Sequence, residues 1–244
     1  MKSFKTTKLL LSLLACVMAW GLTSCNEDSP TYEPTYYSTT TLKPQVDNPG
    51  KFFFLTDAGK KLLPVNTTFP GIENPQQNKR YYIALKKLDS TAVGYDAVVN
   101  IERGVEIPIK DVVLFKEGME DELGKDKVYI PNNEFLGYTP PMWVTDNYIT
   151  IAYALISSGD LKNHIVNLVY DKKYDTNEGY VTLRMTHKAL STSTADMRGP
   201  FLTSFKTDPI KELLKGKKGI KIMAWRSPSS SEMTTFTIEL KNNN

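Results

Sequence analysis

Two histidines, several loop acids and two cysteines are the side chains of this chain with the most scope for chemistry. His164 and His187 fall on different predicted strands, and a structural zinc site normally needs four nitrogen or sulfur ligands. The acids Asp171, Asp175 and Glu178 could bind Ca²⁺, but they lack the spacing of an EF-hand loop. We therefore expect no metal site, with packed or solvated histidines and a solvated acidic turn instead.

Catalytic motifs find equally little support. The sequence contains no G-x-S-x-G elbow and neither a phosphate loop nor a dinucleotide fingerprint. His187 lies near Ser191 and Ser193 in sequence only, whereas a catalytic triad is defined by geometry. The acids of residues 117–122 cluster in a charged segment, which is typical of a solvated surface rather than of two carboxyls facing each other across a cleft. We expect no catalytic residue, no cofactor and no enzyme.

The first 24 residues are typical of a secretory signal peptide. They begin with three lysines, continue with an apolar run over Leu9–Trp20 and end in small residues. The run of about 12 residues is shorter than the roughly 20 that a membrane span needs. Its exit, Leu22-Thr23-Ser24-Cys25, resembles the lipobox of bacterial lipoproteins. That resemblance implies acylation of the Cys25 sulfur and cleavage just before this residue, so that the chain is anchored to a membrane.

Cleavage would change both the thiol content and the charge of the chain. Cys16 would be discarded with the leader and Cys25 acylated, which excludes disulfides and thiol catalysis. Loss of three lysines leaves 27 basic and 27 acidic residues, so a general nucleic-acid partner is not expected. Asn26-Glu27-Asp28 resembles the surface-export signal of lipoproteins in some Gram-negative anaerobes, and we expect the outer membrane, with exposure at the cell surface.

The mature chain is predicted to be all-β, with a small OB-type barrel followed by an antiparallel Ig-like β-sandwich. Residues 25–48 are rich in Thr, Ser and Pro and are interpreted as the lipidated cysteine and a flexible tether spanning roughly 25–30 Å. We place the barrel at 49–115, a charged linker at 116–128 and the sandwich at 129–241. Apolar residues alternate along short segments such as 80–88 and 181–186. Asp208–Gly216 is the one helix candidate, with Asp208 as its cap.

Exposed aromatic residues are the candidates for binding. OB-type barrels often bind oligosaccharides or single strands on one face, and Tyr81 and Tyr82 lie in a predicted barrel strand. Trp143 and Trp225 could form a sugar platform or a partner patch in the sandwich. Packing in the core is the alternative for each of them. Asp89-Ser90-Thr91 resembles a short O-glycosylation motif, which implies a glycan on Ser90.

The layout as a whole resembles the NigD-like lipoproteins. The resemblance rests on the lipobox, the tether, a barrel that opens with FFFLTDAGKKLLP and sandwich strands ITIAYALISS and HIVNLVYD. It implies an OB-type barrel before a β-sandwich, and it supplies no established catalytic residues. The family name comes from a bacteriocin gene cluster, for which an immunity or accessory role has been proposed.

Together these observations predict a non-enzymatic, surface-anchored outer-membrane lipoprotein that acts through protein contacts, in bacteriocin immunity or as an envelope accessory protein. The alternative is a glycan-binding surface lipoprotein of a nutrient-capture system. A co-planar pair of exposed aromatic side chains on one face would favour that alternative.

Overall fold

The computed structural model describes residues 34–45, 48, 50–130, 141–156, 163–175, 179–190 and 197–240. The described residues from Tyr36 onward belong to one compact unit. The predicted signal peptide, Cys25 and residues 26–33 of the predicted tether lie outside the described residues. None of the described helices is both long and apolar enough to cross a bilayer.

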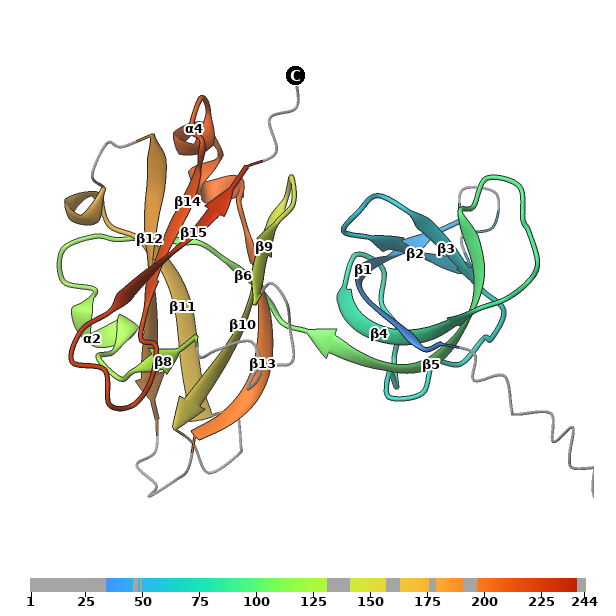
Figure 1. The fold of residues 1–244 in the computed structure, drawn as a ribbon, viewed down its shortest axis with the longest axis horizontal. Coiled ribbons are helices and arrows are strands. Elements are labelled where there is room, and N and C mark those ends of the chain that lie inside the picture. Colours follow the sequence, from blue (N-terminus) through green and yellow to red (C-terminus); the bar gives the residue numbers. More distant parts are fainter. Residues whose placement is uncertain are drawn as a thin grey trace, which may run out of the picture. The chain divides into compact units, whose positions relative to one another are not determined.

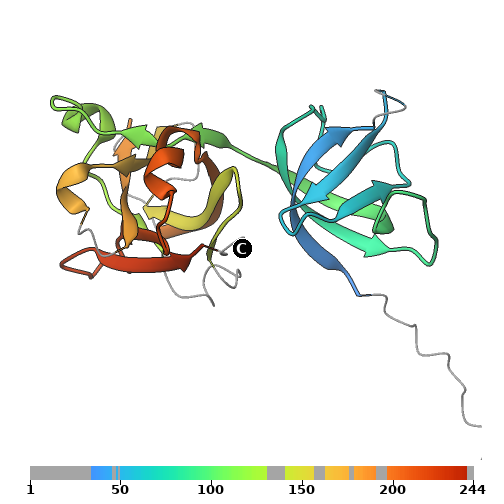
Figure 2. The same cartoon turned by 90° about the horizontal axis from the view of Figure 1, so that it is seen from above.

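Five strands of the first module close into a barrel (Figures 1 and 2). They are β1 (Tyr36–Pro44), β2 (Phe52–Thr56), β3 (Lys61–Pro64), β4 (Arg80–Lys87) and β5 (Ala97–Ile107). Their order around the barrel is β1-β2-β3-β5-β4, and only the β3–β5 pair is parallel. The predicted OB-type barrel is confirmed.

The core of the barrel follows from the alternation of apolar residues along its strands. Tyr81, Ile83 and Leu85 of β4 are buried, whereas their neighbours Tyr82 and Ala84 face outward and are half-buried. The hairpin predicted between β2 and β3 is present, because Gly59 adopts φ 79° in the turn that precedes β3. A side chain is disfavoured at that angle, so the glycine permits the tight turn.

The predicted end of the tether, at residue 48, is wrong, because part of this segment belongs to the barrel. Residues 36–44 form β1, which pairs with β2 on one side and β4 on the other. The segment looks like a linker because its residues are mostly polar, but β-branched threonines suit a strand, and Thr40 and Leu42 are fully buried. The barrel therefore begins at Tyr36.

The predicted barrel end and linker are also wrong. β5 ends at Ile107, and the next two strands, β6 (Ile109–Asp111) and β7 (Val113–Leu114), pair with strands of the sandwich. The charged segment 116–128 holds the short helix α2 (Glu120–Leu123) and the start of β8 (Val128–Tyr129). Leu123 and Val128 are buried, so this segment packs on the sandwich instead of forming a free linker.

The second module is a sandwich of two five-stranded sheets (Figure 1). One sheet has the order β6-β13-β10-β8, with β9 also paired to β10, and the other has the order β15-β14-β12-β11-β7. The remaining strands are β9 (Met142–Val144), β10 (Tyr148–Ile156), β11 (His164–Tyr170), β12 (Tyr180–Ala189), β13 (Met197–Lys206), β14 (Gly219–Ala224) and β15 (Thr234–Glu239). Buried side chains from both sheets form its core, among them Ile149, Ile151, Leu168, Leu183, Phe205 and Ile222.

The sandwich is mixed rather than wholly antiparallel. β6 with β13, β7 with β11, and β12 with β14 are parallel pairs. Alternation in a sequence shows which face of a strand is buried, but it does not show the direction of the neighbouring strand.

Short helical turns complete the module. They are η2 (Lys172–Tyr174), η3 (Asp208–Ile210) and α4 (Lys211–Leu214). The helix predicted at Asp208–Gly216 is thus a 3₁₀ turn followed by one α turn, and its N-cap is Thr207 instead of Asp208.

Candidate functional site

Arg80 occupies an unusual position at the start of β4. Its neighbour Tyr81 points into the barrel, so Arg80 and Tyr82 belong to the outer wall. A charged side chain there would normally be solvated. Arg80 is instead 1% exposed, because sandwich residues that include Thr150 and Ser204 cover it.

Every N–H of the Arg80 guanidinium donates a hydrogen bond. The two terminal nitrogens donate to the two carboxylate oxygens of Asp57 at 2.9 and 2.7 Å. The remaining donors reach the hydroxyls of Ser204 at 2.8 Å, Thr150 at 3.2 Å and Thr41 at 3.3 Å. A guanidinium has five such donors, so this buried charge is fully satisfied.

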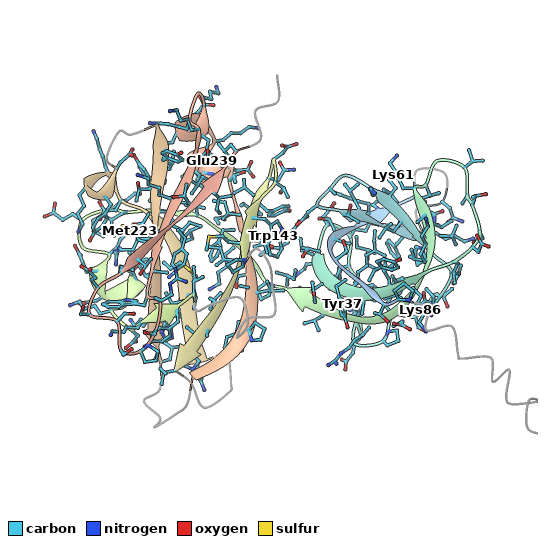
Figure 3. The ribbon with its side chains drawn as sticks, in the orientation of Figure 1. Tyr37, Lys61, Lys86, Trp143, Met223 and Glu239 are labelled. Atoms are coloured by element: carbon cyan, nitrogen blue, oxygen red, sulfur yellow. The ribbon has the colours of Figure 1, made fainter. Side chains whose placement is uncertain are left out.

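Two aromatic side chains of the sandwich complete this arrangement, which we call the junction cluster. The Trp143 indole N–H, on β9 (Figure 3), donates to Oδ2 of Asp57 at 2.7 Å. The Tyr148 ring centroid lies 4.4 Å from Cζ of Arg80, within the range of a cation–π contact. The half-buried Trp143, predicted as a ligand or partner contact, thus has its N–H bonded within the protein.

The junction cluster holds the two modules together. A groove of about 220 Å³ beside it is lined in part by Asp57 and Arg80. Both oxygens of that carboxylate and every donor of that guanidinium already have partners in the cluster. Removal of one partner from a buried ion pair is strongly destabilising, so the cluster joins the outer wall of the barrel to strands of the sandwich through hydrogen bonds that are costly to break.

An exposed aromatic patch lies on the barrel wall next to this contact. Tyr37 is 64% exposed and Val105 is 54% exposed, while Tyr82 is half-buried between them. Tyr82 pairs with Val105 across β4 and β5 and with Thr39 across β4 and β1. The rings of Tyr37 (Figure 3) and Tyr82 stack with centroids 5.9 Å apart and planes at 15°. We call Tyr37, Tyr82 and Val105 the wall patch.

The other predicted contact residues have different surroundings. Tyr81 is fully buried and its hydroxyl accepts the backbone N–H of Gln76, so it belongs to the barrel core and not to a binding surface. Trp225 is half-buried, with the Lys127 ammonium 4.1 Å from its ring centroid. Ser90 is exposed between β4 and β5, and its glycosylation stays a prediction.

The two histidines, which are far apart in sequence, form a hydrogen-bonded pair. His187 on β12 pairs with Val166, two residues beyond His164 on β11, and Nδ1 of His164 is 2.9 Å from Nε2 of His187. Nδ1 of His187 lies 3.2 Å from the Lys127 carbonyl oxygen and must donate to it. Nε2 of His187 then accepts the N–H of His164, which defines both neutral tautomers.

Stability should depend on pH through His187. Burial lowers the pKa of His187 below its ordinary value of 6.5, although Asp126 and the Lys127 carbonyl oppose this shift. As the pH falls through 6.5, the unfolded chain binds a proton before the folded chain does, so the free energy of unfolding falls. Urea titrations over this range should show the loss, and His187→Gln should flatten it. An unchanged pH slope in His187→Gln would contradict the assignment.

Two of the three loop acids named as a possible Ca²⁺ site lie among the described residues, where they contact neighbouring groups of the protein. Oδ1 of Asp171 accepts the backbone N–H of Lys173, and Oδ2 lies 3.4 Å from the same residue's ammonium. Oδ2 of Asp175 accepts the Tyr170 hydroxyl, and Glu178 lies outside the described residues. Across the part of the chain that the structure describes, no three His, Cys, Asp or Glu side chains are grouped to hold a metal ion.

A closed barrel fastened to a two-sheet sandwich defines a class of all-β proteins with two modules. The family model described as the NigD-like C-terminal beta sandwich domain matches residues 111–240. The chain belongs to the NigD-like family, which confirms the resemblance. A comparison with curated proteins finds no match.

Solved structures share the fold over nearly the whole chain. A protein of unknown function from Bacteroides vulgatus is 20% identical, with 86% of this chain and 92% of that chain covered and a TM-score of 0.69. A candidate lipoprotein from Bacteroides fragilis is 12% identical, with 86% and 100% covered and a TM-score of 0.62. A NigD-like immunity protein from Bacteroides caccae is 15% identical, with 84% and 97% covered and a TM-score of 0.55. At these identities the likeness concerns the fold.

Proposed function

We propose that this chain is a lipid-anchored protein of the outer membrane, exposed at the cell surface, that acts through protein contacts in an immunity or envelope accessory role. The lipobox-like residues that end in Cys25 support the anchor. Membership of the NigD-like family supports the role, together with similar structures described as a candidate lipoprotein and as an immunity protein.

The wall patch is the observation that carries the proposal. Tyrosine is enriched among residues that dominate binding energy at protein interfaces, and a stacked pair with an exposed valine offers a firm apolar surface. The strands of a closed barrel are all paired, so a partner must contact side chains instead of adding a strand. The junction cluster holds the same wall in place, which lowers the entropy that binding would otherwise cost.

A glycan is the second candidate, because the planes of the Tyr37 and Tyr82 rings are nearly parallel, with an angle of 15° between them. Sugar rings bind well to aromatic faces that lie side by side in one plane. Here the two rings stack on each other, so part of each face is covered by the other ring. This arrangement favours a protein partner over a sugar.

The double variant Tyr37→Ser/Tyr82→Ser should lose the partner. Truncation of a residue at an interface hot spot weakens binding by 2 kcal/mol or more, so we expect affinity to fall at least about 30-fold. Crosslinking on intact cells, followed by identification of the adduct, measures this directly. Tyr180→Ser in the sandwich is the matched control, because the Tyr180 hydroxyl donates to the exposed Glu239 and its ring lies 5.2 Å from the Lys221 ammonium, both of which belong to the sandwich.

Four results would count against the proposal. An adduct that survives in the double variant would exclude the wall patch. Heat in calorimetry with a glycan, lost in Tyr37→Ser, would favour the sugar alternative. Retention of the Cys25→Ala variant in the membrane fraction would contradict the lipid anchor. Protection of the protein from protease on intact cells would contradict the surface location.

A further inference from the structure

One end of the barrel opens into a pocket of about 320 Å³. Leu62 of β3, Leu85 of β4 and Val99 of β5 form its floor, and all three belong to the buried barrel core. Tyr36, Lys60 and Lys87 stand at its rim. We call this pocket the barrel mouth. It combines an apolar floor with two cations and a 51% exposed aromatic ring.

The rim cations are available to a ligand. Lys60 and Lys87 are exposed, and neither forms an ion pair within the described residues. Asp96 also lines the mouth, but its Oδ2 accepts the backbone N–H of Lys61 at 2.7 Å. The side chain of Lys61 is exposed as well. Two lysines against one aspartate in its lining leave the mouth with a surplus of positive charge.

The chain enters the barrel at this same mouth. Tyr36 is the first residue of β1 and also a rim residue. Ten residues, 26–35, separate it from Cys25, and ten residues cannot reach further than roughly 33–36 Å even when fully extended. The link between Cys25 and the barrel therefore contains fewer residues than the predicted tether of residues 25–48. An acyl group on Cys25 would keep the mouth close to the headgroups of the membrane.

Along β4 the mouth lies at Lys87 and the junction cluster at Arg80, whereas the turn between β2 and β3 brings Asp57 of the cluster within three residues of Lys60 at the rim. Arg80 is the first residue of this strand and Lys87 the last, and eight residues of strand extend over roughly 23 Å. The wall patch lies on the outer face between them.

We propose that the barrel mouth binds the phosphate groups of anionic lipids at the surface of the membrane in which the chain is anchored. Lysine ammonium groups near a membrane bind anionic headgroups electrostatically, and tyrosine side chains favour the interface between headgroups and acyl chains. The apolar floor suits the hydrocarbon part of a lipid. The proposal rests on the anchor in the proposed function, but its test does not require acylation.

The experiment measures binding of the unacylated mature chain, carrying Cys25→Ser, to lipid vesicles by sedimentation. Vesicles of phosphatidylcholine with phosphatidylglycerol should bind the chain better than phosphatidylcholine alone, and added salt should weaken binding. Each lysine near an anionic surface contributes about 1 kcal/mol, so Lys60→Gln/Lys87→Gln should lower the partition coefficient on the order of tenfold or more.

Lys172→Gln/Lys211→Gln is the control, because it removes the same charge from exposed positions of the sandwich. It should leave binding nearly unchanged, and circular dichroism should show both double variants folded. An equal loss of binding in the control would show that the effect comes from net charge alone, and this would overturn the proposed lipid site. Equal binding to neutral vesicles, or full displacement by inorganic phosphate at constant ionic strength, would also overturn it. None of these results depends on the wall patch or on a protein partner.

Discussion

Replacing Arg80 with alanine should lower the free energy of unfolding by about 3–5 kcal/mol, because it leaves a desolvated carboxylate without its counter-charge. Asp57 is only 17% exposed at its side chain, and the hydroxyls of Thr150 and Ser204 would lose their donor as well. Urea denaturation followed by circular dichroism measures the loss. We expect the transition of the variant to split in two, since the barrel and the sandwich would no longer unfold together.

Lys79→Ala is the matched control for this prediction. Lys79 precedes Arg80 and pairs with Glu106 at 2.9 Å, but both partners are largely exposed, and pairs of that kind contribute little to stability. We expect no measurable change. A second variant, Arg80→Met/Asp57→Leu, removes both charges and should recover much of the loss. Wild-type stability in Arg80→Ala would show that the junction cluster does not hold the modules together.

Replacing Tyr81 with alanine should cost about 3–5 kcal/mol, the range measured for large aromatic residues in cores. Its ring is fully buried and packs edge-on against Phe54 with centroids 6.4 Å apart. Its hydroxyl also accepts a backbone N–H. A barrel of five short strands has few other large side chains to fill the cavity, so thermal unfolding of the variant should begin with the barrel.

Tyr82→Ala provides the comparison at the next residue. This side chain is half-buried on the outer wall, so we expect a much smaller loss of stability and, in contrast to Tyr81→Ala, a loss of partner binding in a folded protein. Comparison of the two variants thus distinguishes a residue that stabilises the barrel core from a residue that binds a partner at the surface. Equal destabilisation by both variants would contradict the assignment of the wall patch.

Periodicity predicted the parts of the fold that alternate clearly. β4 and β12 show apolar and polar residues in turn, and the glycine turn between β2 and β3 is visible in the sequence. β1 was missed because its barrel-facing positions include Thr40, a polar residue that bonds the Tyr81 carbonyl when buried. Residues 116–128 were predicted to be a linker because the charged residues of this segment outnumber its buried apolar residues, Leu123 and Val128.

The candidate site was harder to predict, since it depends on contacts between distant strands. Nothing around Arg80 in the sequence indicates burial, and Asp57 looks like an ordinary turn residue. The alternation that places Tyr81 inside the barrel does place Arg80 on the wall, but it cannot show that the sandwich covers the wall there. The His164–His187 pair likewise requires the register of β11 on β12, which the sequence does not show.

The junction cluster also constrains the order in which the protein can assemble. Asp57 and Thr41 are barrel residues, whereas Thr150 and Ser204 follow Arg80 by 70 and 124 residues. Domains usually fold from the N-terminus as the chain becomes available, so the barrel can close while the Arg80 guanidinium is still hydrated. The guanidinium loses its water only when β10 and β13 are in place. Docking of the two modules can therefore follow closure of the barrel, and a chain truncated before Ser204 would lack the hydroxyl that accepts the Nε–H of Arg80.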